Sequence, residues 1–194
     1  MCGIVGYIGE QKVAPILLDG LAKLEYRGYD SAGIACIENG NIEIDKTKGR
    51  LADLSKKIDG GEHIPSTIGI GHTRWATHGK PSDENSHPHL SENGKFAIVH
   101  NGIIENYAEL KSELIKEGFS FRSETDTEVV ANLLEKNDNG DFLETVKKTV
   151  DMLQGSYAFG ILRSDRPDEF VAVRHASPLI VGLGEGENFI ASDV

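Results

Sequence analysis

The residue best placed to do chemistry is Cys2, which directly follows the first methionine of the chain. If Met1 is removed, the Cys2 thiol lies beside a free α-amine. The thiol has a pKa of roughly 8.5 and the amine one of roughly 7.7–8.0, so the amine can accept the thiol proton near neutral pH. Such a pairing is typical of nucleophilic catalysis. The alternative is that Cys2 is a small apolar residue leading into a strand, and with Met1 attached its nitrogen is an amide that cannot act as a base.

Two polar segments offer groups that complement a nucleophile. Arg74 lies in the segment 72–79 and carries a planar guanidinium that suits a carboxylate, although a structural arginine in a solvated loop also explains it. Asn101 and Gly102 combine a side-chain amide with a backbone N–H, and two such donors are able to hold a developing oxyanion. Asn-Gly is also a common turn, which is the simpler interpretation of the pair taken alone.

Clustered histidines and carboxylates raise the question of a metal. The histidines lie in one polar region, at His72, His78, His87 and His89. Their spacing matches no tight ligand pattern such as His-Glu-x-x-His, so we predict neither a metal nor a cofactor. Asp126 belongs to an acidic segment, 123–128, at a predicted helix start, where capping and the helix dipole account for most of the charge. Its carboxylate is also suited to a ligand ammonium group.

The elements that must position these residues follow from hydrophobic periodicity. Strands are predicted at residues 3–8, 32–37, 42–47, 67–73, 96–100, 157–162, 169–174, 179–183 and 188–191. Helices are predicted near residues 13–26, 51–58, 106–118, 125–134 and 141–153, the third with a capping box formed by Asn106 and Glu109. The strand at 96–100 is expected to end at Asn101-Gly102. Strands open the chain, helices fill its middle and strands return, which favours an α+β fold with antiparallel sheets.

Composition narrows the class of protein. The 194 residues include 20 lysines and arginines against 31 aspartates and glutamates, a formal charge of −11 that argues against a nucleic-acid or anionic-membrane binder. Neither a spanning segment nor a signal peptide is predicted. Cys36 lies in an apolar run that reads as a buried strand, so a core thiol is expected. Free thiols and a cytoplasmic location are therefore predicted.

Several motifs together resemble those of a known family. The segments that carry the resemblance are Met1–Gly6, Tyr26–Gly33, Gly71–Gly79, Asn85–His89, Val99–Asn106 and Ser123–Glu128. They look like the motifs of class II glutamine amidotransferases, which are N-terminal-nucleophile hydrolases with an αββα sandwich of antiparallel sheets. The resemblance runs from Cys2 to Asp193. It implies that residues 1–194 are one glutaminase domain, truncated at the C-terminus and lacking its last strands, which would leave a sheet edge exposed.

The resemblance also implies a catalytic centre. Cys2 would attack the side-chain amide of glutamine, with its own α-amine as the base and later as the proton donor to the departing ammonia. Asn101 and the Gly102 N–H would form the oxyanion hole.

The resemblance assigns the remaining site residues to substrate binding. Arg74 would hold the α-carboxylate of glutamine, with Thr77 and His78 beside it. Asp126 would hold the α-ammonium group, and the two charges together would select glutamine among amides. Arg27 would lie near the nucleophile on a loop that closes over the substrate.

The partners implied are L-glutamine and the other domains of a longer parent. Trp75 would gate the passage through which ammonia leaves. Within the family, Tyr29–Ser31 and Trp75–His78 resemble glutaminase domains that supply ammonia to fructose 6-phosphate bound on sugar-phosphate isomerase domains of a homodimeric parent. Two alternatives remain: the glutaminase of another class II enzyme, such as an amidophosphoribosyltransferase, and a metal-binding or regulatory module built on the histidine loop.

Overall fold

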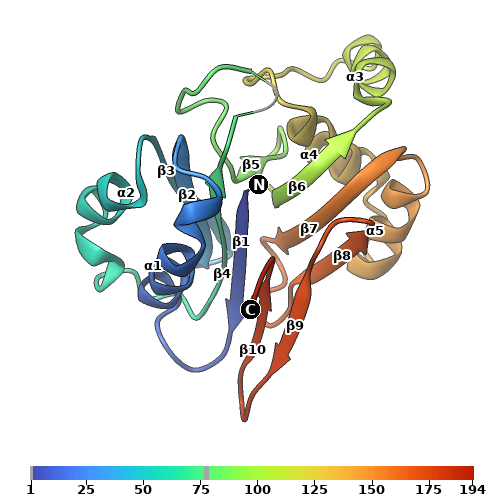
Figure 1. The fold of residues 1–194 in the computed structure, drawn as a ribbon. Coiled ribbons are helices and arrows are strands. Elements are labelled where there is room, and N and C mark those ends of the chain that lie inside the picture. The colour runs from blue at the N-terminus through green and yellow to red at the C-terminus, as the bar shows by residue number, and fades with distance from the viewer. Residues whose placement is uncertain (1, 77–78) are drawn as a thin grey trace.

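The computed structural model describes residues 2–76 and 79–194. Two antiparallel sheets pack against each other, and helices cover the outer side of each sheet (Figure 1). The layers therefore run helix, sheet, sheet, helix. The predicted α+β class and the αββα sandwich are confirmed.

The first sheet has six strands in the order β3-β2-β4-β1-β10-β9. They are β1 (Gly3–Ile8), β2 (Ser31–Glu38), β3 (Asn41–Lys48), β4 (Ile68–Arg74), β9 (Ile180–Leu183) and β10 (Asn188–Ala191). β1, which follows Cys2, lies inside the sheet between β4 and β10. β9 lies at one edge and exposes the apolar side chains of Ile180, Val181 and Leu183.

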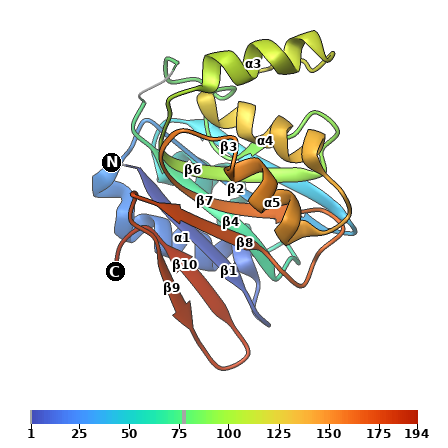
Figure 2. The same ribbon diagram turned by 90° about the vertical axis from the view of Figure 1, so that its right-hand side faces the viewer.

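The second sheet and the helices complete the layers. Its strands, in spatial order, are β5 (His89–Leu90), β6 (Phe96–Ile104), β7 (Gly155–Arg163) and β8 (Val171–His175). The helices are α1 (Val13–Leu24), α2 (Leu51–Lys57), α3 (Tyr107–Lys116), α4 (Asp126–Asn137) and α5 (Phe142–Val150), with 3-10 turns η1 (Glu25–Arg27) and η2 (Asp59–Gly61). Figure 2 shows α3 lying outside α4. Each helix in the described part of the chain is too short or too polar to cross a bilayer.

Alternating side chains from both sheets build the core between them. Ile68 and Ile70 of β4 belong to one buried cluster with Ala97 and Val99 of β6. Since side chains of the same face recur every second residue, the next inward positions are His72 on β4 and Asn101 on β6. The periodicity that fills the core with apolar groups thus brings polar groups together at one end of the sandwich.

The outer face of β4 is built for close approach by α1. A Cβ at Gly71 would lie 2.9 Å from Leu21 Cδ1. A Cβ at Gly69 would lie 3.1 Å from Leu17 Cδ1. Glycine at these positions lets the helix pack directly on the strand. Cys36 is buried in the same outer cluster and is a free thiol, as predicted.

The second sheet differs from the prediction in the length of β6. The strand continues to Ile104, because residues 101–104 pair with residues 155–158 of β7. Asn101-Gly102 is therefore part of a strand and not a turn. Gly102 has φ 113°, and a Cβ there would lie 2.1 Å from Ser156 O, so only glycine fits this close approach. The two-residue strand β5 lies in what was predicted to be loop.

Helix caps confirm the predicted starts at residues 125 and 141. Thr125 accepts a hydrogen bond from the N–H of Glu128 and Asp141 accepts one from the N–H of Glu144. The capping box at Asn106 is wrong, since its side chain makes no cap bond. Its amide instead donates to Met152 O and accepts from the Gln154 N–H, which ties α3 to the segment after α5.

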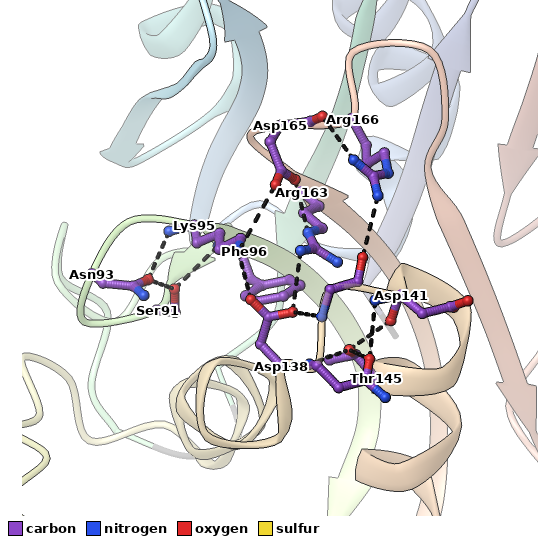
Figure 3. A network of polar contacts seen from close by, with 12 residues as sticks. Ser91, Asn93, Lys95, Phe96, Asp138, Asp141, Thr145, Arg163, Asp165 and Arg166 are labelled. Atoms are coloured by element: carbon purple, nitrogen blue, oxygen red, sulfur yellow. Dashed lines mark hydrogen bonds and ion pairs between the residues drawn. The ribbon is translucent and has the colours of Figure 1, made fainter.

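A polar network fixes the end of β7 to the connection between α4 and α5 (Figure 3). The guanidinium of Arg163 is buried and pairs with Asp138 at 3.1 Å and with Asp165 at 2.8 Å. Asp138 also binds Lys95 and accepts from the Gly140 N–H. Burial raises the pKa of Asp138, but the hydrogen bonds from Lys95 and Gly140 and the charge of Arg163 outweigh it and lower this pKa.

Candidate active site

A cavity of about 310 Å³ opens at the polar end of the sandwich. Seven of the residues predicted for the site line it: Cys2, Arg27, Arg74, Trp75, Asn101, Gly102 and Asp126. The other two predicted residues, Thr77 and His78, lie outside the described residues. A volume of this size suits a small ligand such as an amino acid.

The thiol of Cys2 lies against the backbone that follows β4. The Trp75 N–H donates to Cys2 Sγ at 3.1 Å, and Sγ lies 3.5 Å from Trp75 O. Burial raises the pKa of the Cys2 thiol, and the Trp75 N–H and the charge of Arg74 offset only part of this effect. The thiol is therefore neutral near pH 7, and a nucleophilic role requires a base.

Asn101 lies directly beside Cys2. Its Nδ2 donates to the backbone oxygen of Cys2 at 2.9 Å. Gly102 follows in exposed backbone that also lines the cavity. An amide donor and a strand backbone thus lie at the edge where the thiol is found.

Two opposite charges are held in the cavity wall. Arg74 is 3% exposed and Asp126 is 4% exposed, although both line the cavity. Arg74 ends β4 and donates from Nη2 to Gly79 O at 3.3 Å. Asp126 is the first residue of α4, and its Oδ2 accepts from the Ile104 N–H at 2.8 Å. Burial lowers the pKa of Arg74, while the negative charges near it, including Asp126, counteract this.

Arg27 is tied to the segment that follows β10. Its Nη1 donates to Ser192 O at 2.9 Å and lies 3.3 Å from an Asp193 carboxylate oxygen. That carboxylate also accepts from the hydroxyl of Tyr26. Arg27 therefore lines the cavity from a turn whose position depends on residues far away in sequence.

Trp75 lies at the mouth of the cavity, with 46% of its surface exposed. Its ring packs edge-on against Tyr29, with ring centroids 5.3 Å apart. Asp30 fixes the loop beneath, because its Oδ2 accepts from the Ala76 N–H at 2.8 Å. Tyr29 and Asp30 belong to a recognised motif, but the sequence alone gave them no role.

Two buried histidines that line the cavity, His87 and His100, and a third, His89, contact threonine hydroxyls. The hydroxyl of Thr127 lies 2.8 Å from His87 Nε2 and 2.9 Å from His100 Nδ1. Thr125 Oγ1 lies 2.9 Å from His89 Nε2. Among the described residues no three His, Cys, Asp or Glu side chains are grouped to hold a metal ion. Of the described histidines in the polar region 72–89, His87 lines the cavity.

Several lining residues were not predicted from the sequence. They are His87, His100, Ile103, Thr125, Thr127, Ser177 and Pro178. Thr125 and Thr127 flank Asp126 in the acidic segment at the start of α4. Their position next to a predicted site residue was the sequence signal that could have identified them. Ser177 and Pro178 lie between β8 and β9, where nothing in the local sequence indicates a ligand.

Comparisons with known proteins point to one family. A family model described as a glutamine amidotransferase domain matches residues 72–194. Across the whole chain, identity is 64% to glutamine–fructose-6-phosphate aminotransferase [isomerizing] of Caldanaerobacter subterraneus subsp. tengcongensis and 60% to that of Aquifex aeolicus. The chain covers 32% and 33% of these two proteins, so it spans about a third of their length.

A solved structure shares the fold closely. The glutamine phosphoribosylpyrophosphate amidotransferase from B. subtilis, complexed with ADP and GMP, aligns with a TM-score of 0.85 and 28% identity. The alignment covers 98% of this chain and 42% of that one. The family model covers more than half of the chain, and the sandwich matches that of a solved amidotransferase. The chain belongs to the glutamine amidotransferase domain family.

Proposed function

We propose that residues 1–194 form a glutaminase domain that hydrolyses L-glutamine to glutamate and ammonia, with Cys2 as the nucleophile. The observation that carries this proposal is the content of one cavity: a thiol, an amide donor beside it, and a buried arginine and aspartate. The thiol and the amide donor suit the side-chain amide of glutamine, and the two charges suit its α-carboxylate and α-ammonium groups.

The first half of the reaction forms a thioester. Once Met1 is removed, the α-amine of Cys2 takes the thiol proton and Sγ attacks the side-chain carbonyl carbon of glutamine. The carbonyl oxygen becomes an oxyanion that accepts from Asn101 Nδ2 and the Gly102 N–H. The C–N bond then breaks, and the protonated α-amine returns its proton to the nitrogen that leaves as ammonia.

The second half regenerates the enzyme. The α-amine takes a proton from water, whose oxygen attacks the thioester carbon. The C–S bond breaks, the thiolate regains the proton, and glutamate leaves. The base is needed in the first half because burial raises the pKa of the Cys2 thiol, and in the second half because neutral water is a weak nucleophile.

Specificity for the amino-acid end would come from charge. The guanidinium of Arg74 binds the α-carboxylate in a bidentate manner and the carboxylate of Asp126 binds the α-ammonium group. Thr77 and His78 complete the carboxylate side. Arg27 closes the cavity near the nucleophile, and Trp75 controls the path by which ammonia leaves.

The ammonia acceptor belongs to the longer parent protein. We propose that the parent transfers ammonia to fructose 6-phosphate on isomerase domains, acts as a homodimer and works in amino-sugar synthesis in the cytoplasm. The support is the 64% and 60% identity to proteins named for that reaction. The alternative acceptor chemistry, that of phosphoribosylpyrophosphate amidotransferase, is supported by a solved structure at 28% identity.

The test compares two single-cysteine variants. We expect Cys2→Ala to lose glutamate release by more than about a thousandfold, since no covalent step remains, with an unchanged circular dichroism spectrum. Cys36→Ala removes the other thiol and keeps the activity. A glutamine-like chloroketone should add once to the wild-type chain, on Cys2, and free glutamine should block it. Glutamate release that survives in Cys2→Ala would contradict the proposal.

A further inference from the structure

One buried side chain, His72, joins the two sheets behind the nucleophile. It lies on β4 of the first sheet and is 0% exposed. Its Nε2 lies 3.0 Å from His100 O and 3.0 Å from Asn101 Oδ1, both on β6 of the second sheet. His72 does not line the cavity and has no part in the reaction described above.

The backbone partner decides which nitrogen of His72 carries the hydrogen. A carbonyl oxygen can only accept, so the 3.0 Å contact with His100 O requires a hydrogen on Nε2. Burial lowers the pKa of His72 to about 3, so the ring is neutral and Nδ1 carries no hydrogen. Consistent with this tautomer, no described residue forms a hydrogen bond with Nδ1.

This tautomer in turn fixes the amide of Asn101. The Nε2–H must face the amide oxygen, which leaves the amide nitrogen on the opposite side. There Nδ2 donates to Cys2 O at 2.9 Å. A flipped amide would place N–H groups against Nε2–H and an oxygen against the oxygen of Cys2, so both ends of the amide oppose rotation.

We propose that His72 is a positioning residue, whose Nε2–H holds the Asn101 amide with its N–H donors toward the carbonyl that Cys2 attacks. The inference rests on the proposed function, because it needs Asn101 to stabilise an oxyanion. Without this bond, of the two contacts described only the one with Cys2 O still opposes rotation of the amide, and in the rotated state an oxygen lone pair faces the developing negative charge.

Two substitutions separate this role from packing. The side-chain amide of His72→Gln reaches about as far as the ring Nε2, so its N–H can still donate to the Asn101 amide oxygen. The side-chain amide of His72→Asn is shorter and reaches only the position of the ring Nδ1. We expect His72→Asn to lower kcat by about 10- to 100-fold with KM changed less than about threefold, since an oxyanion donor supplies about 10²–10³ in kcat. His72→Gln should keep kcat within about fivefold of wild type.

A double-mutant cycle of His72 and Asn101 distinguishes a positioning role of His72 from a purely structural one. In an Asn101→Ala background, His72→Asn should cost almost nothing further in kcat, because the amide that it positions is gone. If the double variant loses kcat by the product of the two single losses, the positioning role is overturned. A His72→Asn chain with the kcat of wild type would overturn it as well. Neither result would affect the assignment of Cys2, which the Cys2→Ala comparison tests separately.

The tautomer itself is measurable in the wild-type chain. Long-range ¹H–¹⁵N spectra should show His72 as the neutral Nε2–H tautomer from pH 8 down to pH 5. An Nδ1–H tautomer, or protonation within this range, would overturn the inference. This measurement needs neither activity nor a variant that folds.

Discussion

At the scale of single residues, Asp126 offers the sharpest test of how substrate is chosen. Asp126→Asn keeps an oxygen that accepts from the Ile104 N–H but loses the charge. We expect KM for glutamine to rise by about 10- to 100-fold with little change in kcat, since a charge-assisted hydrogen bond contributes about 1.5–3 kcal/mol. Steady-state glutamate release measures both constants.

A substrate lacking the α-amino group, 4-carbamoylbutanoate, provides the control for Asp126→Asn. Wild type should discriminate strongly against it, and the variant should treat it and glutamine almost alike. An Asp126→Asn chain that still prefers glutamine as strongly as wild type would show that another group binds the ammonium.

The residues found from the sequence share one property. Cys2, Arg74, Asn101 and Asp126 each lie at the start or end of a predicted element or within a strand near its end, so periodicity and motif placed them together. Ser177 and Pro178 reach the same cavity from the β8–β9 connection. Their place is set by how distant strands pack, which local sequence does not encode.

At the scale of elements, the network around Arg163 should stabilise the fold without affecting the site. Asp138→Ala leaves a buried guanidinium with Asp165 as its remaining carboxylate partner among the described residues. We expect a loss of about 3 kcal/mol in the free energy of unfolding, the lower end for a broken buried pair, with kcat unchanged. Urea denaturation measures the loss.

The control for Asp138→Ala is an ion pair at the surface. Glu144 and Lys147 form one in which both side chains are more than half exposed. Glu144→Ala should cost less than about 1 kcal/mol. Equal losses in the two variants would mean that burial of Arg163 adds nothing to the pair.

Element prediction failed where long-range partners compete with local signals. Asn-Gly at 101–102 reads as a turn, yet pairing with β7 extends β6 through it. Asn106 has the spacing of a cap, yet its amide is taken by the segment after α5. The side chains of Thr125 and Asp141 accept hydrogen bonds from the first turns of their own helices, so these helices begin where predicted.

At the scale of the whole molecule, the buried histidines should make stability depend on pH. Burial lowers the pKa of His72 to about 3 and those of His87 and His89 well below 6.5. Below pH 6.5 the unfolded chain therefore binds protons that the folded chain does not, so stability present above pH 6.5 is lost as pH falls. Each histidine contributes a slope of about 1.4 kcal/mol per pH unit.

Urea midpoints between pH 7.5 and 5 measure this slope. His87→Gln should reduce the slope of unfolding free energy against pH by the contribution of about one proton. His63→Gln, at an exposed position, should leave this slope unaltered. A wild-type midpoint that stays constant from pH 7 to pH 5 would contradict the prediction.

The placement of β1 has a consequence for the order in which the molecule is completed during synthesis. β1, the strand after Cys2, leaves the ribosome before its two neighbours β4 and β10, and β10 follows every other strand among the described residues (Figure 1). Ser192 closes this end, since its N–H donates to Ile4 O and its hydroxyl accepts from the Ile4 N–H. Cys2 thus gains its final surroundings only after residue 192 has been added, so translation must pass residue 192 before the proposed nucleophile is in place.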